Sequence, residues 1–468
     1  MTTRAMNMTT TRGTGRSLIL LTMCLGVLVA QIDTSVVNLA LKHISADLAA
    51  NVSQLQWVVD SYNLTYAALL LTGGVLADLY GRRRIFAVGL ALFTIGSLIC
   101  GFAPNVAALI IGRTVAGIGA ALEVPTTLAI LASVYPDPDE RALPLGIWAS
   151  CNGLAFIIGP TLGGVLVDHE GWRSIFLLIV PLCVLALGLT WSVVPESAAP
   201  KGRTLDLPGQ GLAIVALGAL SLAAIEGPSW GLNSVWEICA LIVFIAALVA
   251  FLRVEAKTVG ALLPLDLFKN ASFSASIAVA ALMTFGMYAM LFLTPLYLQS
   301  ARGASAIIAG LQLLPMSVSF VIVSQLSGRL TKIFGPRVIT CCGMAAMGIG
   351  KWLMALFLGG NLLWIEAALL VIGVGLGLNT APIQNVAVTS VQQDRAGTAS
   401  GLVNTARMVG ATLGVAILGL LLGAHPGAGE NAISGYRLAY LIGGTGELIG
   451  ALIAAIFVSP HSLRAAKR

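Results

Sequence analysis

Charged residues are scarce in this chain, which excludes an ordinary soluble protein. Only 10% of the 468 residues are Asp, Glu, Lys or Arg, whereas 57% are apolar and the mean hydropathy is +0.93. Soluble domains carry about 25% charged residues, so the composition predicts an integral membrane protein. The net charge of +6 has two interpretations, nucleic-acid binding or membrane orientation, and the positions of the basic residues decide between them.

Patterns for metal binding, disulfides or nucleophilic catalysis are missing as well. The four histidines have no metal-ligand spacing and fall in expected loops or tails, and the sequence has no nucleophile elbow or phosphate loop. The cysteines all lie inside apolar stretches, which indicates small buried side chains rather than a disulfide framework. We therefore expect no cofactor and no metal. The histidines are His43, His169, His425 and His461, and the cysteines are Cys24, Cys100, Cys151, Cys183, Cys239, Cys341 and Cys342.

Long apolar runs, by contrast, fill the chain. A membrane-spanning helix needs about 20 mostly apolar residues, and breaking the sequence at polar, Gly/Pro or charged clusters leaves fourteen candidates. The first run is too long for a signal-peptide core and has no clear cleavage site, so we interpret it as a retained span. The predicted spans cover 17–41, 55–79, 85–103, 106–134, 143–167, 173–194, 209–227, 235–253, 273–299, 305–329, 338–358, 361–391, 397–423 and 437–458.

Basic residues are distributed unevenly among the loops. With a cytoplasmic N-terminus, the cytoplasmic segments carry 19 Lys and Arg residues and the outer loops carry 4, while three lie within spans. Cytoplasmic loops of membrane proteins are enriched in Lys and Arg, so we predict that both termini are cytoplasmic. This distribution also explains the positive net charge without a nucleic-acid partner. The outer-loop residues are Lys42, Arg173, Arg302 and Arg437, and those within spans are Arg113, Lys351 and Arg407.

Two pairs of segments repeat each other at nearly one offset. The stretch "GGVLADLYGRRRI" (73–85) matches "SGRLTKIFGPRVI" (327–339) at an offset of 254, and "GPTLGG" (159–164) matches "GATLGV" (410–415) at an offset of 251. Self-similarity of this kind indicates a duplicated structural unit, here of six helices. Because the offset exceeds half the chain length, something is inserted between the two copies.

The predicted architecture is therefore an all-α membrane protein with two related halves. We expect a six-helix bundle over residues 1–198, an inserted two-helix hairpin over 199–268, and a second six-helix bundle over 269–468. Transporters built from two six-helix halves bind substrate near the bilayer midplane, at the interface, and rock one half against the other.

Several motifs resemble those of a known transporter family. They are "GVLADLYGRRR" (74–84) after the second span, "GRTVAGIGAALEVP" (112–125) in the fourth, "GLAFIIGPTLGG" (153–164) in the fifth, and "QIDTSVVNLAL" (31–41) and "QWVVDSY" (56–62) in the first two. Over nearly its whole length the chain resembles the major facilitator superfamily, specifically its fourteen-helix drug:proton antiporter-2 branch. The resemblance implies a major facilitator fold, and the fifth-span motif implies antiport.

Acidic residues inside the spans are the candidate proton-coupling groups. Asp33 lies about eight residues, or ~12 Å, from the outer end of the first predicted span, and intramembrane acids are functional by default. Asp60 has a similar depth in the second span, so the two carboxylates are candidates for one cavity and a coupled titration. Arg113 needs a buried partner and Asp33 is the natural one, while Glu123 is a further candidate. The structural alternative is a permanent salt bridge between Asp33 and Arg113.

Other motif residues receive roles from the resemblance. It implies a cytoplasmic gate in which Asp78 and the arginines join the two halves when the site faces outward. Glu140 is a nearby candidate partner, and plain positive-inside anchoring is the alternative for the arginines. In the fifth span, small residues allow close helix approach and a proline bends the helix, with ordinary packing as the alternative. The gate comprises Gly74, Asp78, Gly81, Arg82, Arg83 and Glu140, and the antiporter motif comprises Gly159, Pro160, Gly163 and Gly164.

Three of the charged residues within the later spans, Arg407, Glu447 and Lys351, have an expected role or position. The resemblance to the drug:proton antiporter-2 branch implies that the position of Arg407 is often basic. Arg407 and Glu447 are candidate cavity residues. Lys351, near one end of its span, is expected to extend its ammonium group to the lipid headgroups.

Taken together, the sequence predicts a proton-coupled exporter. We expect a multi-pass protein of a bacterial cytoplasmic membrane, acting as a monomer, whose partners are a small-molecule substrate, protons and lipid. The substrate is expected to be hydrophobic and cationic, with export of one metabolite, such as an antibiotic, lipid or siderophore, as the alternative. A membrane enzyme is disfavoured by the missing catalytic motifs, and a channel would conduct without proton coupling.

Overall fold

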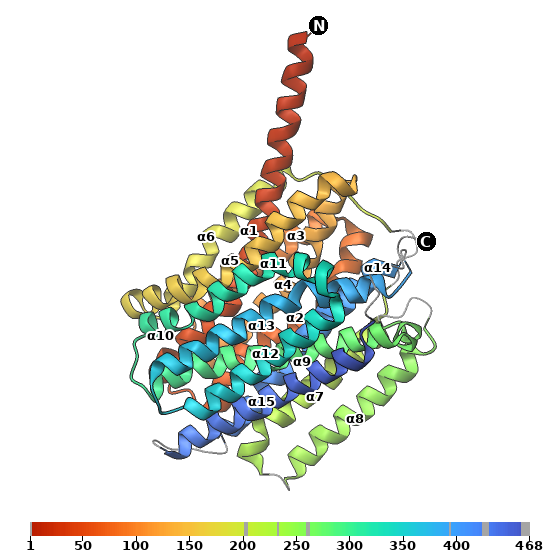
Figure 1. Ribbon diagram of the computed structural model, residues 1–468. Coiled ribbons are helices and arrows are strands. Elements are labelled where there is room, and N and C mark those ends of the chain that lie inside the picture. The colour runs from red at the N-terminus through yellow and green to blue at the C-terminus, as the bar shows by residue number, and fades with distance from the viewer. Residues whose placement is uncertain are drawn as a thin grey trace.

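The computed structural model consists of helices and short connections (Figure 1). It describes residues 2–200, 205–231, 234–258, 263–392, 395–423 and 430–459, and no strand occurs among them. Of the residues named above, His425 and His461 lie outside these ranges, as do five of the 19 basic residues assigned to the cytoplasmic side, namely Lys201, Arg203, Arg464, Lys467 and Arg468. The helices are α1 (Thr2–Leu48), α2 (Val52–Tyr80), α3 (Arg82–Gly101), α4 (Val106–Val134), α5 (Pro138–Glu170), α6 (Arg173–Val193), α7 (Leu207–Trp230), α8 (Val235–Glu255), α9 (Ala271–Ser300), α10 (Ala306–Gln312), α11 (Leu314–Phe334), α12 (Pro336–Phe357), α13 (Leu362–Thr389), α14 (Ala396–Gly423) and α15 (Glu430–Phe457).

Each predicted span corresponds to a helical segment. The tenth span is divided into α10 and α11, which meet at Leu313, and the first helix continues to Leu48 rather than ending near residue 41. Thirteen segments of the described chain are long and apolar enough to cross a membrane, with α10 and α11 counted as one. Helix α2 is outside that set, yet it is buried against α4 and α14 and completes the fourteen.

The duplicated loops adopt equivalent backbone conformations. Gly81 ends α2 with φ of 105° and Gly335 ends α11 with φ of 84°. Positive φ strains other residues but not glycine, so both repeats need glycine at this place. Each glycine N–H donates to the carbonyl four residues earlier, Gly81 to Ala77 and Gly335 to Thr331.

The second repeated motif also has equivalent packing in the two halves. A Cβ on Gly159 or Gly163 of α5 would collide with side chains of α1. In the same way, a Cβ on Gly410 or Gly414 of α14 would collide with the backbone of α9. Small residues therefore let α5 approach α1 and let α14 approach α9, as expected for related six-helix units.

The inserted hairpin lies at the side of the molecule. Helix α7 packs against both α2 and α14, whereas α8 packs mainly against α7 and lies at the periphery (Figure 1). Most side chains of α8 are exposed in the absence of lipid, and its buried residues are Ala240, Ala247 and Glu255.

The two halves meet near the ends of the helices that lie farthest from the N-terminus. Lys42 of α1 donates to the Gln299 carbonyl of α9 at 2.8 Å, and the Gln299 amide donates back to the Leu39 carbonyl at 2.9 Å. Asp168 of α5 accepts from the backbone N–H groups of Ala306 and Ile307, which begin α10, at 3.0 and 2.9 Å. Contacts between the halves are therefore polar and tight at this end.

Candidate functional site

Asp33 and Arg113 form a completely buried ion pair. Arg113 Nη1 of α4 lies 2.5 Å from Asp33 Oδ2 of α1, and the two side chains are 2% and 1% exposed. Arg113 Nε also donates to the Val58 carbonyl of α2 at 3.0 Å, and the guanidinium lies 4.5 Å from the centre of the Tyr62 ring. A buried charge is stable only when it is paired and hydrogen-bonded. Arg113 therefore joins α1, α2 and α4 through the carboxylate of Asp33.

The distance of Asp33 from the end of its helix is greater than the sequence predicted. Because α1 extends to Leu48, Asp33 lies fifteen residues, or ~22 Å, from that end of the helix. The polar residues of segment 42–48 do not begin a loop, because they bind other parts of the protein, and the helix therefore continues through them. Lys42 binds across to α9, and Asp47 binds Trp172 and Arg173 at 3.0 and 2.6 Å.

Asp60 does not share a site with Asp33, which corrects the expectation of one coupled pair. Val58 and Tyr62, four residues apart, mark the face of α2 that meets Arg113. Asp60 is two residues from each and therefore lies on the opposite face, where Ser221 of α7 is beside it. The side chain of Asp60 is completely buried, and neither carboxyl oxygen has a well-formed hydrogen bond in the described structure.

Glu123 is buried inside the first six helices. Its side chain has no exposed surface, and its carboxyl oxygens have no hydrogen-bond partner among the described residues. Gly89 of α3 is close, because a Cβ there would lie 3.0 Å from the Cβ of Glu123. Asp33 is its main electrostatic neighbour. Burying an unpaired carboxylate costs several kcal/mol, so a charge on Glu123 would destabilise this arrangement.

The geometry of the α2–α3 loop rests on contacts within the first half of the molecule. Arg82 donates to Asp78 at 2.9 Å and to the Ala129 carbonyl of α4 at 3.1 Å. Gly81 supplies the tight turn between α2 and α3, with positive φ. At Gly74 a Cβ would make only ordinary contact, 3.9 Å from Pro125, so this glycine is not required by packing here.

Glu140 has a different partner from the one predicted. Its carboxylate pairs with Arg16 of α1 at 3.1 Å. The acid beside the loop arginines is Glu196, at 3.9 Å from Arg83 and 3.7 Å from Arg84. Sequence distance favoured Glu140, but the segment after α6 returns to this loop, where Arg82 N donates to the Ser197 carbonyl.

The fifth-span motif contacts both halves. Gly159 and Gly163 face α1, whereas a Cβ on Gly164 would collide with Ala306 and Ile307 of α10 in the other half. The Pro160 carbonyl fits against Gly310 of α10 in the same manner. The motif therefore lies where α5 meets the second half, directly before Asp168.

Glu447 and Lys351 form a second buried ion pair, so the expected extension of Lys351 to headgroups is wrong. Lys351 Nζ of α12 contacts Glu447 Oε1 of α15, and both side chains are at most 1% exposed. Gly286 of α9 faces the pair, since a Cβ there would meet the Glu447 carboxyl. Arg407 of α14 donates to the Thr380 carbonyl of α13 at 2.7 Å and so joins two helices of the second half.

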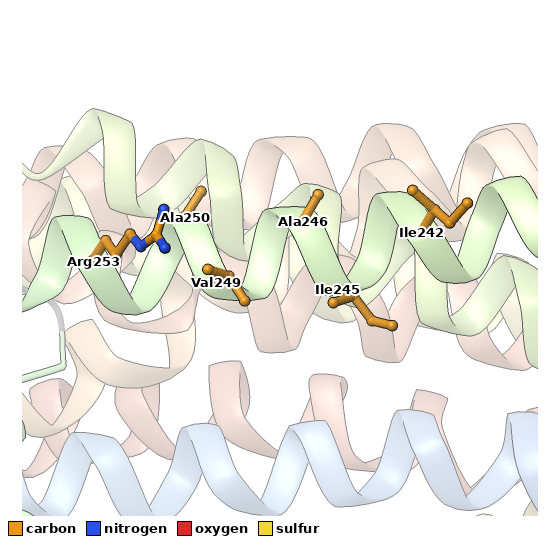
Figure 2. Close-up of a pocket in the computed structure, with 6 residues that line it drawn as sticks. All are labelled: Ile242, Ile245, Ala246, Val249, Ala250 and Arg253. Atoms are coloured by element: carbon orange, nitrogen blue, oxygen red, sulfur yellow. The ribbon is translucent and has the colours of Figure 1, made fainter.

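A surface groove lies apart from all of these acids. It runs along one side of α8 and is lined by aliphatic side chains with Arg253 at one end, as Figure 2 shows. Its other lining residues are Ile242, Ile245, Ala246, Val249 and Ala250. An apolar face on a peripheral membrane helix is what lipid contact requires, so we assign no substrate to it.

Two polar residues that join the halves, Asp168 and Gln299, were missed from the sequence. Both stand near the ends of spans, where a polar side chain ordinarily indicates a loop. The signal available was the proximity of Asp168 to the "GPTLGG" motif, which the structure places at the junction.

Comparisons with known proteins identify relatives along the whole chain. The sequence matches the Major Facilitator Superfamily over residues 23–415. It is 40% identical over 405 residues to the multidrug resistance protein Stp of Mycobacterium tuberculosis, covering 86% of this chain and 74% of that one. It is 36% identical over 458 residues to the methylenomycin A resistance protein of Bacillus subtilis, covering 97% of each.

Solved structures share the fold at low sequence identity. A peptide transporter, POT, in complex with sulfate has a TM-score of 0.68 at 15% identity, over 94% of this chain and 93% of that one. A D-xylose-proton symporter has a TM-score of 0.67 at 16% identity, over 95% and 98%. The prediction of an all-α membrane protein with this fold is confirmed. The fourteen-segment helical architecture, its duplicated packing and these matches show that the chain is a multi-pass membrane protein of the major facilitator superfamily.

Proposed function

We propose that this protein is a proton-coupled antiporter that exports hydrophobic, cationic small molecules by alternating access. The observation that carries the proposal is the set of completely buried acids in the first six helices, Asp33, Asp60 and Glu123. Relatives named for multidrug resistance, antibiotic resistance and drug efflux support export. Fourteen spans and the motifs of the first, second, fourth and fifth helices support the drug:proton antiporter-2 branch.

The proposed orientation places both termini in the cytoplasm of a bacterial cell. Its support is the excess of Lys and Arg in the loops on that side. The polar contacts of Lys42, Gln299 and Asp168 between the halves then lie at the outer face, which corresponds to an inward-facing state. We further propose that the halves move as units over 1–198 and 269–468, and that the protein acts as a monomer and not as an enzyme.

In the proposed cycle, Asp33 exchanges its proton as the halves move. Protonation removes its charge and weakens its attraction to Arg113, which then needs another anion or water. A cationic substrate competes for the same carboxylate, so proton binding and substrate binding exclude each other. A gradient of one pH unit supplies about 1.4 kcal/mol per proton, and 100 mV supplies about 2.3 kcal/mol per net charge moved. Exchange of one proton for one monovalent cation uses only the pH gradient.

Efflux in everted membrane vesicles tests the proposal. We expect wild-type vesicles to release protons when a cationic dye is added, and Asp33→Asn vesicles to lose that release. Asp47→Asn is the matched control, because Asp47 lies on the same helix and pairs with Arg173 outside the proposed site. Substrate-induced proton release that survives Asp33→Asn removes Asp33 from the coupling role, and its absence from wild type refutes antiport.

Export of one specific metabolite is the second candidate. Its support is the naming of relatives after single compounds, namely methylenomycin A in Streptomyces coelicolor and tetracenomycin C in Streptomyces glaucescens. A panel of cationic dyes, neutral antibiotics, lipids and siderophores separates the two candidates. Proton release with several unrelated cations supports the multidrug function, and release with one compound alone supports the alternative.

A further inference from the structure

Helix α7, the first of the inserted pair, is joined to the first half by polar contacts along most of its length. Near its start, Gln210 accepts from the Thr72 hydroxyl and donates to the Ala68 carbonyl at 2.6 Å. Near its end, Ile225 accepts from Ser53 at 3.1 Å and Glu226 accepts from Trp57 at 2.8 Å. Each of these contacts runs to α2, as does every hydrogen bond described between α7 and either bundle.

The contact of α7 with the second half has a different character. Ala224 and Ile225 of α7 form a separate apolar cluster with Ala416 of α14, against which Trp57 packs. Hydrogen bonds are directional, whereas apolar contact is non-directional and depends on area. The apolar contact between α7 and α14 therefore permits sliding once α14 releases the bonds that Gln56 of α2 donates to the Val415 and Ala416 carbonyls. The hydrogen bonds between α7 and α2 hold those two helices in one register.

Asp60 lies on the face of α2 that α7 covers. Ser53, Trp57 and Asp60 follow helical spacing, so they share one stripe of α2. The Ser221 hydroxyl, completely buried in the middle of α7, is the polar group beside the carboxyl of Asp60. Helix α7 therefore covers one side of this carboxyl and places a potential hydrogen-bond donor beside it, which an ionised carboxylate inside a membrane protein requires.

Charged groups inside the other helices packed against α2 form no ion pair with Asp60. Inside the predicted spans, the charged side chains of the helices packed against α2 are few. Asp33 and Arg113 pair with each other, Arg407 donates to a backbone carbonyl, Glu226 accepts from Trp57, and Glu123 has no hydrogen-bond partner in the described structure. None of them is an ion-pair partner of Asp60 in the described structure. Ser221 is thus the group best placed to influence the protonation of Asp60.

We propose that α7 is a permanent seventh helix of the first half and that Ser221 is a positioning residue for the Asp60 carboxyl. The Ser221 hydroxyl donates to the ionised carboxylate when Asp60 has lost its proton. Helices α2 and α7 move as one unit while α14 slides over α7. This inference rests on the proposed function, because it assigns a positioning residue to one of its proton-coupling groups. It assigns no such role to α8, which is placed by α7 and lipid.

The first test is the pH dependence of substrate-induced proton release by Ser221→Ala. Removing a donor to a carboxylate destabilises the ionised form, so we expect the midpoint of the pH profile to move upward by about one unit. Ser97→Ala is the matched control, because Ser97 is equally buried on α3 with an unpartnered hydroxyl. Ser221→Thr keeps a hydroxyl and should restore the wild-type profile.

The second test asks with which half α7 moves. In a transport-active chain whose seven native cysteines are replaced, Thr72→Cys with Gln210→Cys joins α7 to α2, and Ala224→Cys with Ala416→Cys joins α7 to α14. A short thiol cross-linker should leave transport by the first pair within twofold of its unlinked form. It should reduce transport by the second pair at least tenfold, with recovery when a cleavable linker is reduced.

The outcomes separate this inference from the proposed function. If wild-type vesicles release no protons when substrate is added, antiport is refuted. The cross-linking comparison does not depend on that result, because it measures only substrate flux. An unchanged pH profile in folded Ser221→Ala overturns the role of Ser221. Loss of transport on joining α7 to α2, or its retention on joining α7 to α14, overturns the assignment of α7 to the first half.

Discussion

We expect Asp168 to hold the two halves together at the proposed outer face, and its substitution should open that face. The carboxylate of α5 accepts two backbone N–H groups of α10, from Ala306 and Ile307, at 3.0 and 2.9 Å. Asp168→Asn removes the charge and leaves one oxygen to accept, whereas Asp168→Ala removes both acceptors. Neither change alters the packing of Gly164 against the same turn.

The expected magnitude follows from the two charge-assisted bonds. A hydrogen bond to a charged group contributes about 1.5–3 kcal/mol, and the Asp168 side chain is only 16% exposed. In an outward-open state the freed groups bind water, so we take about 2 kcal/mol as the net loss on Asp168→Ala. A change of about 2 kcal/mol shifts the equilibrium between closed and open outer faces roughly thirtyfold. For Asp168→Asn we expect about half that free-energy change, hence roughly fivefold.

Cysteine accessibility measures this equilibrium. Ala309 of α10 is completely buried, so Ala309→Cys in a chain without native cysteines should react slowly with a membrane-impermeant maleimide at the outer face. The reaction rate is expected to rise about thirtyfold with Asp168→Ala and about fivefold with Asp168→Asn. Local opening that is fast compared with the reaction makes the rate proportional to the open population.

Asp47→Asn is the control for a change of charge at the same end. Asp47 pairs with Arg173 and Trp172 inside the first half, so the labelling of Ala309→Cys should stay within twofold. An accessibility that does not rise with Asp168→Ala, or that rises as much with Asp47→Asn, refutes the reasoning that Asp168 holds this end closed.

Three further substitutions have expected outcomes in thermal unfolding of the purified protein. Arg113→Gln leaves Asp33 buried without its cation and should cost about 3–5 kcal/mol, whereas adding Asp33→Asn should recover most of that loss; equal stability of single and double variants would argue against the pair. Lys351→Met should likewise destabilise the second half, with recovery on adding Glu447→Gln, and a melting temperature unchanged by Lys351→Met alone contradicts the buried contact. Gly81→Ala forces a Cβ onto a residue with φ of 105° and should cost about 1–3 kcal/mol, so a wild-type melting temperature would show that the turn relaxes.

Much of the fold was predictable because its determinants are local. Apolar runs of sufficient length define the spans wherever they lie, and both repeats end a helix with a glycine because only glycine accepts positive φ without strain. The predicted span boundaries were wrong where contacts between helices, rather than local hydropathy, determine the end of a helix. Helix α1 continued past residue 41 because Lys42 and Asp47 found partners in other helices, which hydropathy does not register.

The candidate site was predictable in composition but not in arrangement. Buried acids stand out in any membrane-spanning sequence, and Asp33 with Arg113 is the pair that charge alone favours. Similar depth in adjacent spans favoured one site for Asp60 and Asp33, yet Asp60 lies on the opposite face of α2 toward Ser221. Glu140 and Lys351 were likewise assigned by nearness in sequence or to a helix end, and each found another partner.

The amino-acid sequence by itself therefore determined that the chain is a duplicated bundle of membrane helices with acids inside it. That information is carried by hydropathy, glycine positions and the repeat, each of which acts within one helix or one turn. Only the tertiary structure decided which acid faces which partner, how α7 covers Asp60 and where Asp168 joins the halves. The physical reason is that the rotation of each helix about its axis is set by packing against residues far away in the chain.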